Sequence, residues 1–257
     1  MPKAGELTYV QKIGDAGVAF ALNKPFSDPM CGDYMIAIGT LRNLLPAPPG
    51  RMLDLGCGTG WTSCMFAKMG YDVVGQDIAP DMISCANHNK AREQLSNVKF
   101  VVSDYESMPY QDEFDCAMFF DSLHHAEDEY LALEMVYRAL KPGGVLVTRE
   151  PGDGHSKNEL TIHAMEEYGV TEKDMPPRKI VSMAKEIGFS KHNVFPFPDY
   201  IVKRFYREHE NRDRPAGFLA RCAYQFHDWM FAIRRLKAVH KMNLAKHSVG
   251  GIVCLVK

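Results

Sequence analysis

The chain has 257 residues, 46% of them hydrophobic, and is therefore long enough to bury a large core without disulfide bonds. Its formal net charge of −2 excludes a strongly basic nucleic-acid binder on bulk charge alone. The cysteines form no Cys-x-x-Cys pair and no Cys/His cluster, which indicates a reducing compartment and gives no reason to expect a metal site.

Residues 1–50 precede the first strand that the sequence predicts, and they contain no apolar secretion signal. No apolar run approaches membrane-spanning length, so we expect a cytoplasmic protein without a membrane span. Within this segment Gly32–Leu45 has apolar residues at helical spacing, and the prolines from Pro46 onward end the helix. One interpretation is a helix that packs on the edge of the sheet.

Arg51–Gly60 reads Arg-Met-Leu-Asp-Leu-Gly-Cys-Gly-Thr-Gly, which predicts a buried strand that turns sharply into a helix. Its glycines allow positive φ angles and let a ligand approach the main chain. The following helix directs unpaired amides toward that ligand. The spacing Gly-x-Gly-x-Gly differs from the Gly-x-Gly-x-x-Gly of dinucleotide sites, and Asp54 would repel a pyrophosphate. The turn therefore favours a ligand that carries an ammonium group and no phosphate.

Strand and helix patterns alternate from this turn onward. Alternation of this kind predicts an α/β fold with a parallel sheet, whose ligands bind at the carboxyl ends of the strands. The predicted strands are 52–55, 72–76, 98–103, 116–120, 145–149, 193–197 and 251–256. The predicted helices are 62–69, 80–94, 127–140, 159–168 and 177–187.

The glycine turn and four later motifs resemble those of class I S-adenosylmethionine (SAM) dependent methyltransferases, in the family's order and spacing. The resemblance covers Arg51–Glu150. It implies a Rossmann-like, seven-stranded, mostly parallel sheet with helices on both faces. It also implies SAM as the cofactor, S-adenosylhomocysteine as the product, and no metal. The motifs are Leu53–Gly60, Gly75-Gln76-Asp77-Ile78, Ser103-Asp104, Phe119-Phe120-Asp121 and Leu140-Lys141-Pro142-Gly143-Gly144.

The resemblance also suggests a domain organisation. Residues 1–50 would form a lid over the cofactor, and residues 51–198 the SAM-binding core. In the family the last two strands usually form a hairpin, whereas here residues 199–250 intervene. We expect a helical cap over the active face in this insertion, with residues 251–257 returning as the final core strand.

The family's cofactor contacts can be carried over to matching positions. Asp77 would accept both ribose hydroxyls, although it could instead cap the helix that begins at Pro80. Asp104 would meet the adenine amine, and Asp54 would lie near the ammonium group. The remaining predicted cofactor residues are Gly56, Cys57, Gly58 and Gly60 at the methionine end, Ile78, Met82 and Tyr105 around the adenine, and Phe120 beside the sulfonium.

The candidates for proton transfer follow the fourth and fifth strands. His124 and His125 come directly after the fourth strand, and either could serve as general base for a hydroxyl or thiol acceptor. Either one could equally hydrogen-bond a loop. Glu150 and His155 are further candidates from the facing side.

Clues to the acceptor are few. Between Asp199 and Ser248 the chain carries eleven Lys/Arg and five Asp/Glu. Such a cap could bind an anionic acceptor, or it could be a solvated helix face. Asn23–Gly32 resembles segments of methyltransferases associated with surface-glycan assembly.

We therefore expect methyl transfer to a small-molecule or glycan acceptor, to oxygen. The alternatives are an RNA or protein methyltransferase that uses the basic cap, although no separate nucleic-acid module is present, and a non-catalytic SAM-binding protein.

Overall fold

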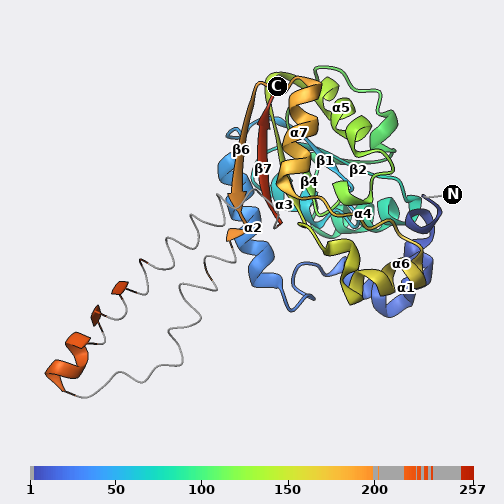
Figure 1. The fold of residues 1–257 in the computed structure, drawn as a ribbon. Coiled ribbons are helices and arrows are strands. Elements are labelled where there is room, and N and C mark those ends of the chain that lie inside the picture. The colour runs from blue at the N-terminus through green and yellow to red at the C-terminus, as the bar shows by residue number, and fades with distance from the viewer. Residues whose placement is uncertain are drawn as a thin grey trace.

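The computed structural model describes residues 3–198 and 250–257, with residues 202, 217–223, 225–226, 229–230 and 233 between them. The described chain contains a seven-stranded sheet in the order β3-β2-β1-β4-β5-β7-β6 (Figure 1). The first five strands are parallel, and β7 runs antiparallel to both β5 and β6. The predicted sheet is confirmed. The strands are β1 (Arg51–Leu55), β2 (Asp72–Asp77), β3 (Val98–Val102), β4 (Phe114–Phe120), β5 (Leu140–Glu150), β6 (Lys191–Pro196) and β7 (Gly251–Val256).

Helices cover both faces of this sheet. Residues of α2 (Cys31–Leu44), α3 (Trp61–Lys68) and α4 (Pro80–Arg92) share one apolar cluster with the sheet. Residues of α5 (Glu129–Ala139) and α7 (Pro177–Ile187) share the other. Successive strand residues alternate between the two clusters, as the period of a strand requires. The strands thus form the middle of a three-layer core.

Most boundaries lie within a few residues of the predicted ones. Helices α6 (Glu159–Tyr168) and α7 coincide with their predicted ranges. Strand β5 begins at Leu140, five residues before its predicted start, because the Leu140–Gly144 segment continues the extended chain.

Helix α1 (Ala4–Leu22) was not predicted from the sequence. This helix packs against α4 and α6 (Figure 1). It is broken at Gly14, whose φ of 64° and ψ of 179° lie outside the helical region. Polar contacts anchor it to the core: Lys3 Nζ donates to Glu106, Lys12 Nζ to the Tyr168 carbonyl, Gln11 Nε2 to Asp81, and Thr59 Oγ1 to the Ala21 carbonyl, at 2.6–3.1 Å.

Most of the predicted cap, residues 199–250, lies outside the described residues, so the cap and its basic cluster stay predictions. In the described part of the chain, no helix combines the length and the apolar character needed to cross a bilayer.

Candidate active site

The turn between β1 and α3 contains three glycines with left-handed backbone angles. Gly56, Gly58 and Gly60 have φ of 66°, 52° and 73°. A Cβ at Gly60 would lie 2.5 Å from Phe100 Cζ, and one at Gly56 would lie 2.6 Å from Ser122 Cβ. At Gly58 a Cβ would meet no atom within 4 Å. Gly56 and Gly60 therefore fit the turn against its neighbours, whereas Gly58 leaves free space in front of the main chain.

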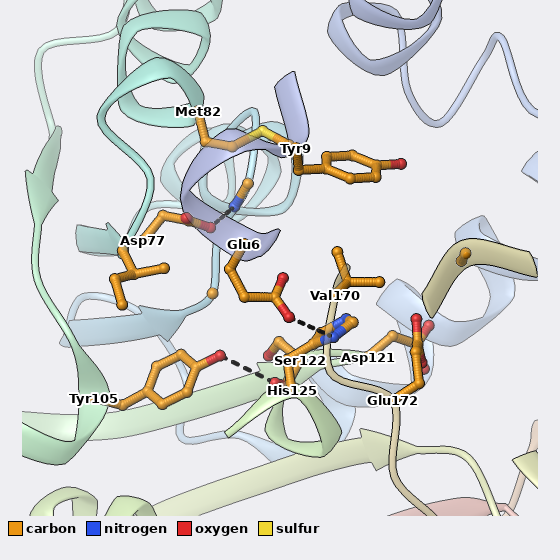
Figure 2. Close-up of a pocket in the computed structure, with 14 residues that line it drawn as sticks. Glu6, Tyr9, Asp77, Met82, Tyr105, Asp121, Ser122, His125, Val170 and Glu172 are labelled. Carbon is orange, nitrogen blue, oxygen red and sulfur yellow. Dashed lines mark hydrogen bonds and ion pairs between the residues drawn. The ribbon is translucent and has the colours of Figure 1, made fainter. Parts of the chain in front are cut away.

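Asp77 ends β2 beside this turn, and its carboxylate is held by backbone amides. Oδ2 accepts a hydrogen bond from the Gly58 N–H at 2.9 Å (Figure 2). Oδ1 accepts one from the Ala79 N–H, also at 2.9 Å. Burial raises the pKa of Asp77, although these amides favour the charged form. Asp77 thus orders the chain that leads into α4 without capping the helix itself, and its contact with the ribose stays a prediction.

A cavity of about 270 Å³ opens above the turn. One part of its lining comes from predicted cofactor residues: Gly56, Gly58, Asp77, Ile78, Met82 and Tyr105. The opposite wall is polar and includes Asp121, Ser122, His125 and Glu172 (Figure 2). Helix α1 contributes Glu6 and Tyr9 from above.

A second cavity, of about 360 Å³, shares Tyr9, Gly56, Gly58 and Met82 with the first. Its remaining lining includes the predicted residues Cys57 and Phe120, together with Trp61, Phe20 and Lys24. The two cavities meet at the glycine turn and extend under α1. A ligand that occupies both cavities would therefore pass over the exposed main chain of Gly58.

Asp54 lies behind the turn and lines neither cavity. Its side chain is buried, and its Oδ2 accepts hydrogen bonds from Thr62 Oγ1 at 2.7 Å and Ser63 Oγ at 2.6 Å. Burial raises the pKa of Asp54 to about 6, against the opposing effect of the two hydroxyls. The carboxylate therefore ties the end of β1 to the start of α3.

Asp104 also lies outside the lining of both cavities. Its Oδ1 accepts from the Glu106 N–H at 3.1 Å, which caps the short helix η1 (Tyr105–Ser107). Its Oδ2 forms an ion pair with Lys3 at the start of α1. In this structure the predicted adenine-binding carboxylate is thus occupied by α1.

The predicted His-His pair lies in the short helix η2 (Leu123–His125) at the end of β4. His124 Nδ1 lies 2.7 Å from Glu150 Oε2, and Glu150 also accepts the N–H groups of Ser122 and Leu123. Burial alone would lower the pKa of His124, but Glu150 and Glu172 raise it to about 10. The structure therefore brings His124 and Glu150 together as a buried pair.

His125 faces the cavity instead. Its Nδ1 lies 2.6 Å from the Thr171 carbonyl. The same nitrogen lies 3.6 Å from Glu6 Oε1 (Figure 2). Burial and the neighbouring charge of His124 lower the pKa of His125 to about 4. Among the three predicted catalytic residues, His125 is the one that lines the cavity. With this lowered pKa the ring is neutral near pH 7, so it can accept a proton but is a weaker base than an ordinary histidine, and its catalytic role stays a prediction.

Glu6, Tyr9 and Glu172 were not identified from the sequence. Glu6 and Tyr9 belong to the helix that was not predicted, and Glu172 lies in the loop between α6 and α7. His155, in the short helix η3 (His155–Lys157), reaches Glu172 Oε2 with its Nε2 at 2.7 Å. No spacing in the sequence connects these segments, so no signal singled out Glu172.

Asp121 and Arg149 support the aromatic wall of the second cavity. Asp121 has a φ of 50°, which is uncommon for a residue other than glycine, and its carboxylate pairs with Arg149. The Arg149 guanidinium lies 5.0 Å from the Phe120 ring centre and 4.6 Å from that of Phe197. These contacts fix Phe120, the predicted neighbour of the sulfonium.

Comparison with protein families places a match at residues 53–148, to a family described as a methyltransferase domain. The chain is 33% identical over 159 residues to 24-methylenesterol C-methyltransferase 2 of Oryza sativa subsp. japonica, covering 57% of this chain and 43% of that protein. It is 35% identical over 119 residues to the ubiquinone/menaquinone biosynthesis C-methyltransferase UbiE of Pectobacterium atrosepticum, covering 44% and 47%. The chain thus spans less than half the length of these two curated relatives.

Solved structures share the fold. Phosphoethanolamine N-methyltransferase 2 of Haemonchus contortus, in complex with S-adenosyl-L-methionine, has a TM-score of 0.66 at 22% identity, covering 99% of this chain and 60% of that one. A SAM-dependent methyltransferase of Mesorhizobium loti has a TM-score of 0.58 at 18% identity, covering 85% and 96%.

Proposed function

We propose that this chain, which belongs to the class I SAM-dependent methyltransferase family, binds SAM at the glycine turn and transfers its methyl group to a small molecule. The observation that carries the proposal is the arrangement of Gly58 and Asp77. Gly58 leaves open space before the main chain, and its N–H is held by a carboxylate that lines the same cavity.

The residues present fit this cofactor. Asp77 would accept the ribose hydroxyls, and Ile78 and Met82 would flank the adenine on the same wall of the first cavity. The backbone of Gly56 and Gly58, which lines both cavities, would lie against the methionine portion. The sulfonium would then lie where the cavities meet, with Phe120 on one side and the polar wall of the first cavity on the other. The bound cofactor supplies an electrophilic methyl group. The protein's part is to align the acceptor with that group and to exclude water.

Asp54 and Asp104 already have partners in the protein, so their proposed contacts with the cofactor need either a water molecule or a broken ion pair. Asp54 would act on the ammonium group through water, because its Oδ2 already accepts from Thr62 and Ser63. Asp104 would meet the adenine amine only after its ion pair with Lys3 opens. Cofactor binding and the position of the α1 N-terminus would therefore be coupled.

The lining of the first cavity supports a polar acceptor. Carboxylates, phenols, a hydroxyl and an imidazole face it, and a sterol ring system would cover the hydrogen-bonding capacity that these groups retain beyond their partners in the protein. Two curated relatives are named for sterol and quinone C-methylation, so the acceptor class has to be decided by experiment. We propose transfer to oxygen of a hydroxylated small molecule, with sugars as the first class to test.

His125 would then receive the acceptor's proton. Its Nδ1 is placed to donate to the Thr171 carbonyl, which leaves Nε2 with a lone pair. This tautomer is assigned from the hydrogen-bond partner.

The test combines binding and transfer with the purified chain. Calorimetry should detect SAM and S-adenosylhomocysteine binding, and methyl-labelled SAM should label a sugar pool more strongly than sterol, quinol or RNA pools. Absence of SAM binding would remove the proposal as a whole. Binding with label only in sterol or quinol would contradict the polar acceptor, and label in RNA would favour the rival enzyme. Binding without transfer to any pool would favour a non-catalytic SAM-binding protein.

A further inference from the structure

Three imidazoles and a carboxylate meet beside the first cavity. We name His124, His125, His155 and Glu172 the histidine–glutamate cluster. Glu172 Oε2 lies 2.7 Å from His155 Nε2 and 3.3 Å from His124 Nε2. Ligand atoms of His124, His125 and Glu172 all lie within 4.8 Å of one another. Ligand atoms on a tetrahedral zinc ion are separated by roughly 3.4 Å, so only small side-chain movements separate His124, His125 and Glu172 from a coordination shell, and His155 is connected to them through Glu172.

The partners of the ring nitrogens favour metal ligation. His124 Nδ1 faces the Glu150 carboxylate at 2.7 Å, and His125 Nδ1 faces the Thr171 carbonyl at 2.6 Å. Each acceptor holds a proton on Nδ1 and leaves Nε2 as the ligating atom. Histidine ligands in metal sites are oriented in this way, by a carboxylate or a carbonyl behind the ring.

We propose that the histidine–glutamate cluster binds one divalent transition-metal ion, with Zn²⁺ as the best match, through His124, His125 and Glu172, and with His155 as the fourth ligand. The ligand set is rich in imidazole, which suits zinc and its neighbours better than Mg²⁺ or Ca²⁺. The ion would displace the hydrogen-bonding protons between the histidines and Glu172, as ligand deprotonation requires.

The position of the cluster gives the ion access to the cavity. His125 and Glu172 belong to the cavity lining, whereas His124 lies behind them and is buried. A bound ion would thus lie on the polar wall of the cavity, opposite Ile78 and Met82. The acceptor is proposed to bind at this polar wall. No metal was expected from the sequence, because no Cys/His cluster occurs along the chain. The four residues instead come from three separate segments that the fold brings together.

This inference does not rest on the proposed function, and its test uses no methyl transfer. An ion on His125 Nε2 would use the lone pair that the proposed proton transfer needs, so that proton transfer is proposed for the metal-free chain. The full chain, stripped with a chelator and dialysed, is titrated with Zn²⁺ by calorimetry in the absence of SAM. We expect one ion per chain, confirmed by elemental analysis. Glu172→Gln and His125→Ala should each weaken Zn²⁺ binding at least 100-fold, by analogy with the roughly 10–100-fold effects of losing second-shell partners. The matched control is His163→Ala, since His163 pairs with Glu167 on α6 and its side chain is 69% exposed. This control should bind as the unaltered chain does.

Circular dichroism reports whether each variant folds, and Co²⁺ provides a readout on the unaltered chain. Visible d–d absorption bands should appear with one equivalent of Co²⁺ and disappear on addition of Zn²⁺. The proposal is overturned if the unaltered chain shows neither stoichiometric Zn²⁺ binding nor these bands. It is equally overturned if folded Glu172→Gln and His125→Ala bind Zn²⁺ as tightly as the control. Separate SAM titrations of the metal-free chain report on the proposed function, so the two failures are distinguishable.

Discussion

The Gly58 N–H donates to Asp77 Oδ2 at 2.9 Å, which joins the turn after β1 to the carboxyl end of β2. Neighbouring parallel strands end at the same edge of the sheet, so a residue nineteen positions later meets the glycine turn. One carboxylate thereby orders the backbone of the turn and presents its remaining acceptor capacity to the cavity.

Replacement of this carboxylate should abolish cofactor binding. Asp77→Ala removes the proposed ribose contacts, and hydrogen bonds to a charged group contribute about 1.5–3 kcal/mol each. We expect SAM affinity, measured by calorimetry, to fall about 100-fold or more while circular dichroism stays unchanged. Asp72→Ala is the matched control, because Asp72 is an exposed carboxylate at the other end of the same strand. Equal SAM affinity in the two variants would show that the ribose assignment is wrong.

Two glycine substitutions should separate cofactor binding from folding. Gly60→Ala drives a methyl group into Phe100 and Ala86, so we expect a loss of several kcal/mol in the free energy of unfolding. Gly58→Ala meets open space, and its cost of about 1 kcal/mol arises from the positive φ alone. The new methyl group would, however, stand where the cofactor is proposed to lie. Chemical denaturation and SAM calorimetry check the pair, and a Gly58→Ala protein with unaltered SAM affinity would contradict the site.

Asp54 should make stability depend on pH. Burial raises its pKa to about 6 in the folded chain, above the ordinary value near 3.8, so the folded protein holds the proton more tightly. This stabilising contribution is complete below about pH 4 and is lost as pH rises through about 6. Asp54→Asn removes the effect. At pH 8 we expect the variant to be more stable by up to about 3 kcal/mol in urea unfolding, and the two proteins to converge near pH 4. Parallel pH profiles for the two proteins would contradict the assignment.

Lys3 should compete with SAM for Asp104. If the adenine amine needs this carboxylate, binding must break a partly exposed ion pair of the kind that contributes at most about 1 kcal/mol. Lys3→Ala should therefore raise SAM affinity about threefold, with a smaller gain at high salt. Lys12→Ala is the control from the same helix, because Lys12 contacts the Tyr168 carbonyl. A gain in both variants would point to general loosening of α1 rather than to Asp104.

The fold was largely predictable because strand and helix periods, proline stops and glycine turns are local signals. Helix α7, for example, begins at a proline and ends before Gly188, and its predicted range coincides with the structure. Helix α1 was not predicted. Of its residues, all described, Gly5 alone is buried, so it shows no apolar stripe facing a core.

The site was predictable only in part. Asp77 and the glycines follow strands whose ends must meet, and spacing along the chain therefore places them near one another. Glu172 and His155 reach the cavity from loops, where position depends on tertiary packing. Glu6 and Tyr9 depend on how α1 packs on the core. The Asp54 side chain points toward the Thr62 and Ser63 hydroxyls at the start of α3. The alternation of residues along a strand does not predict these two contacts.

Helix α1 contributes to the lining of both cavities, and hydrogen bonds, the ion pairs of Lys3 and a ring contact between Tyr9 and Tyr168 hold it on the core. Under the proposed function, cofactor that leaves past this helix would be released faster if the helix detached more often. If that release limited turnover, faster chemistry at the strand ends would bring no faster catalysis.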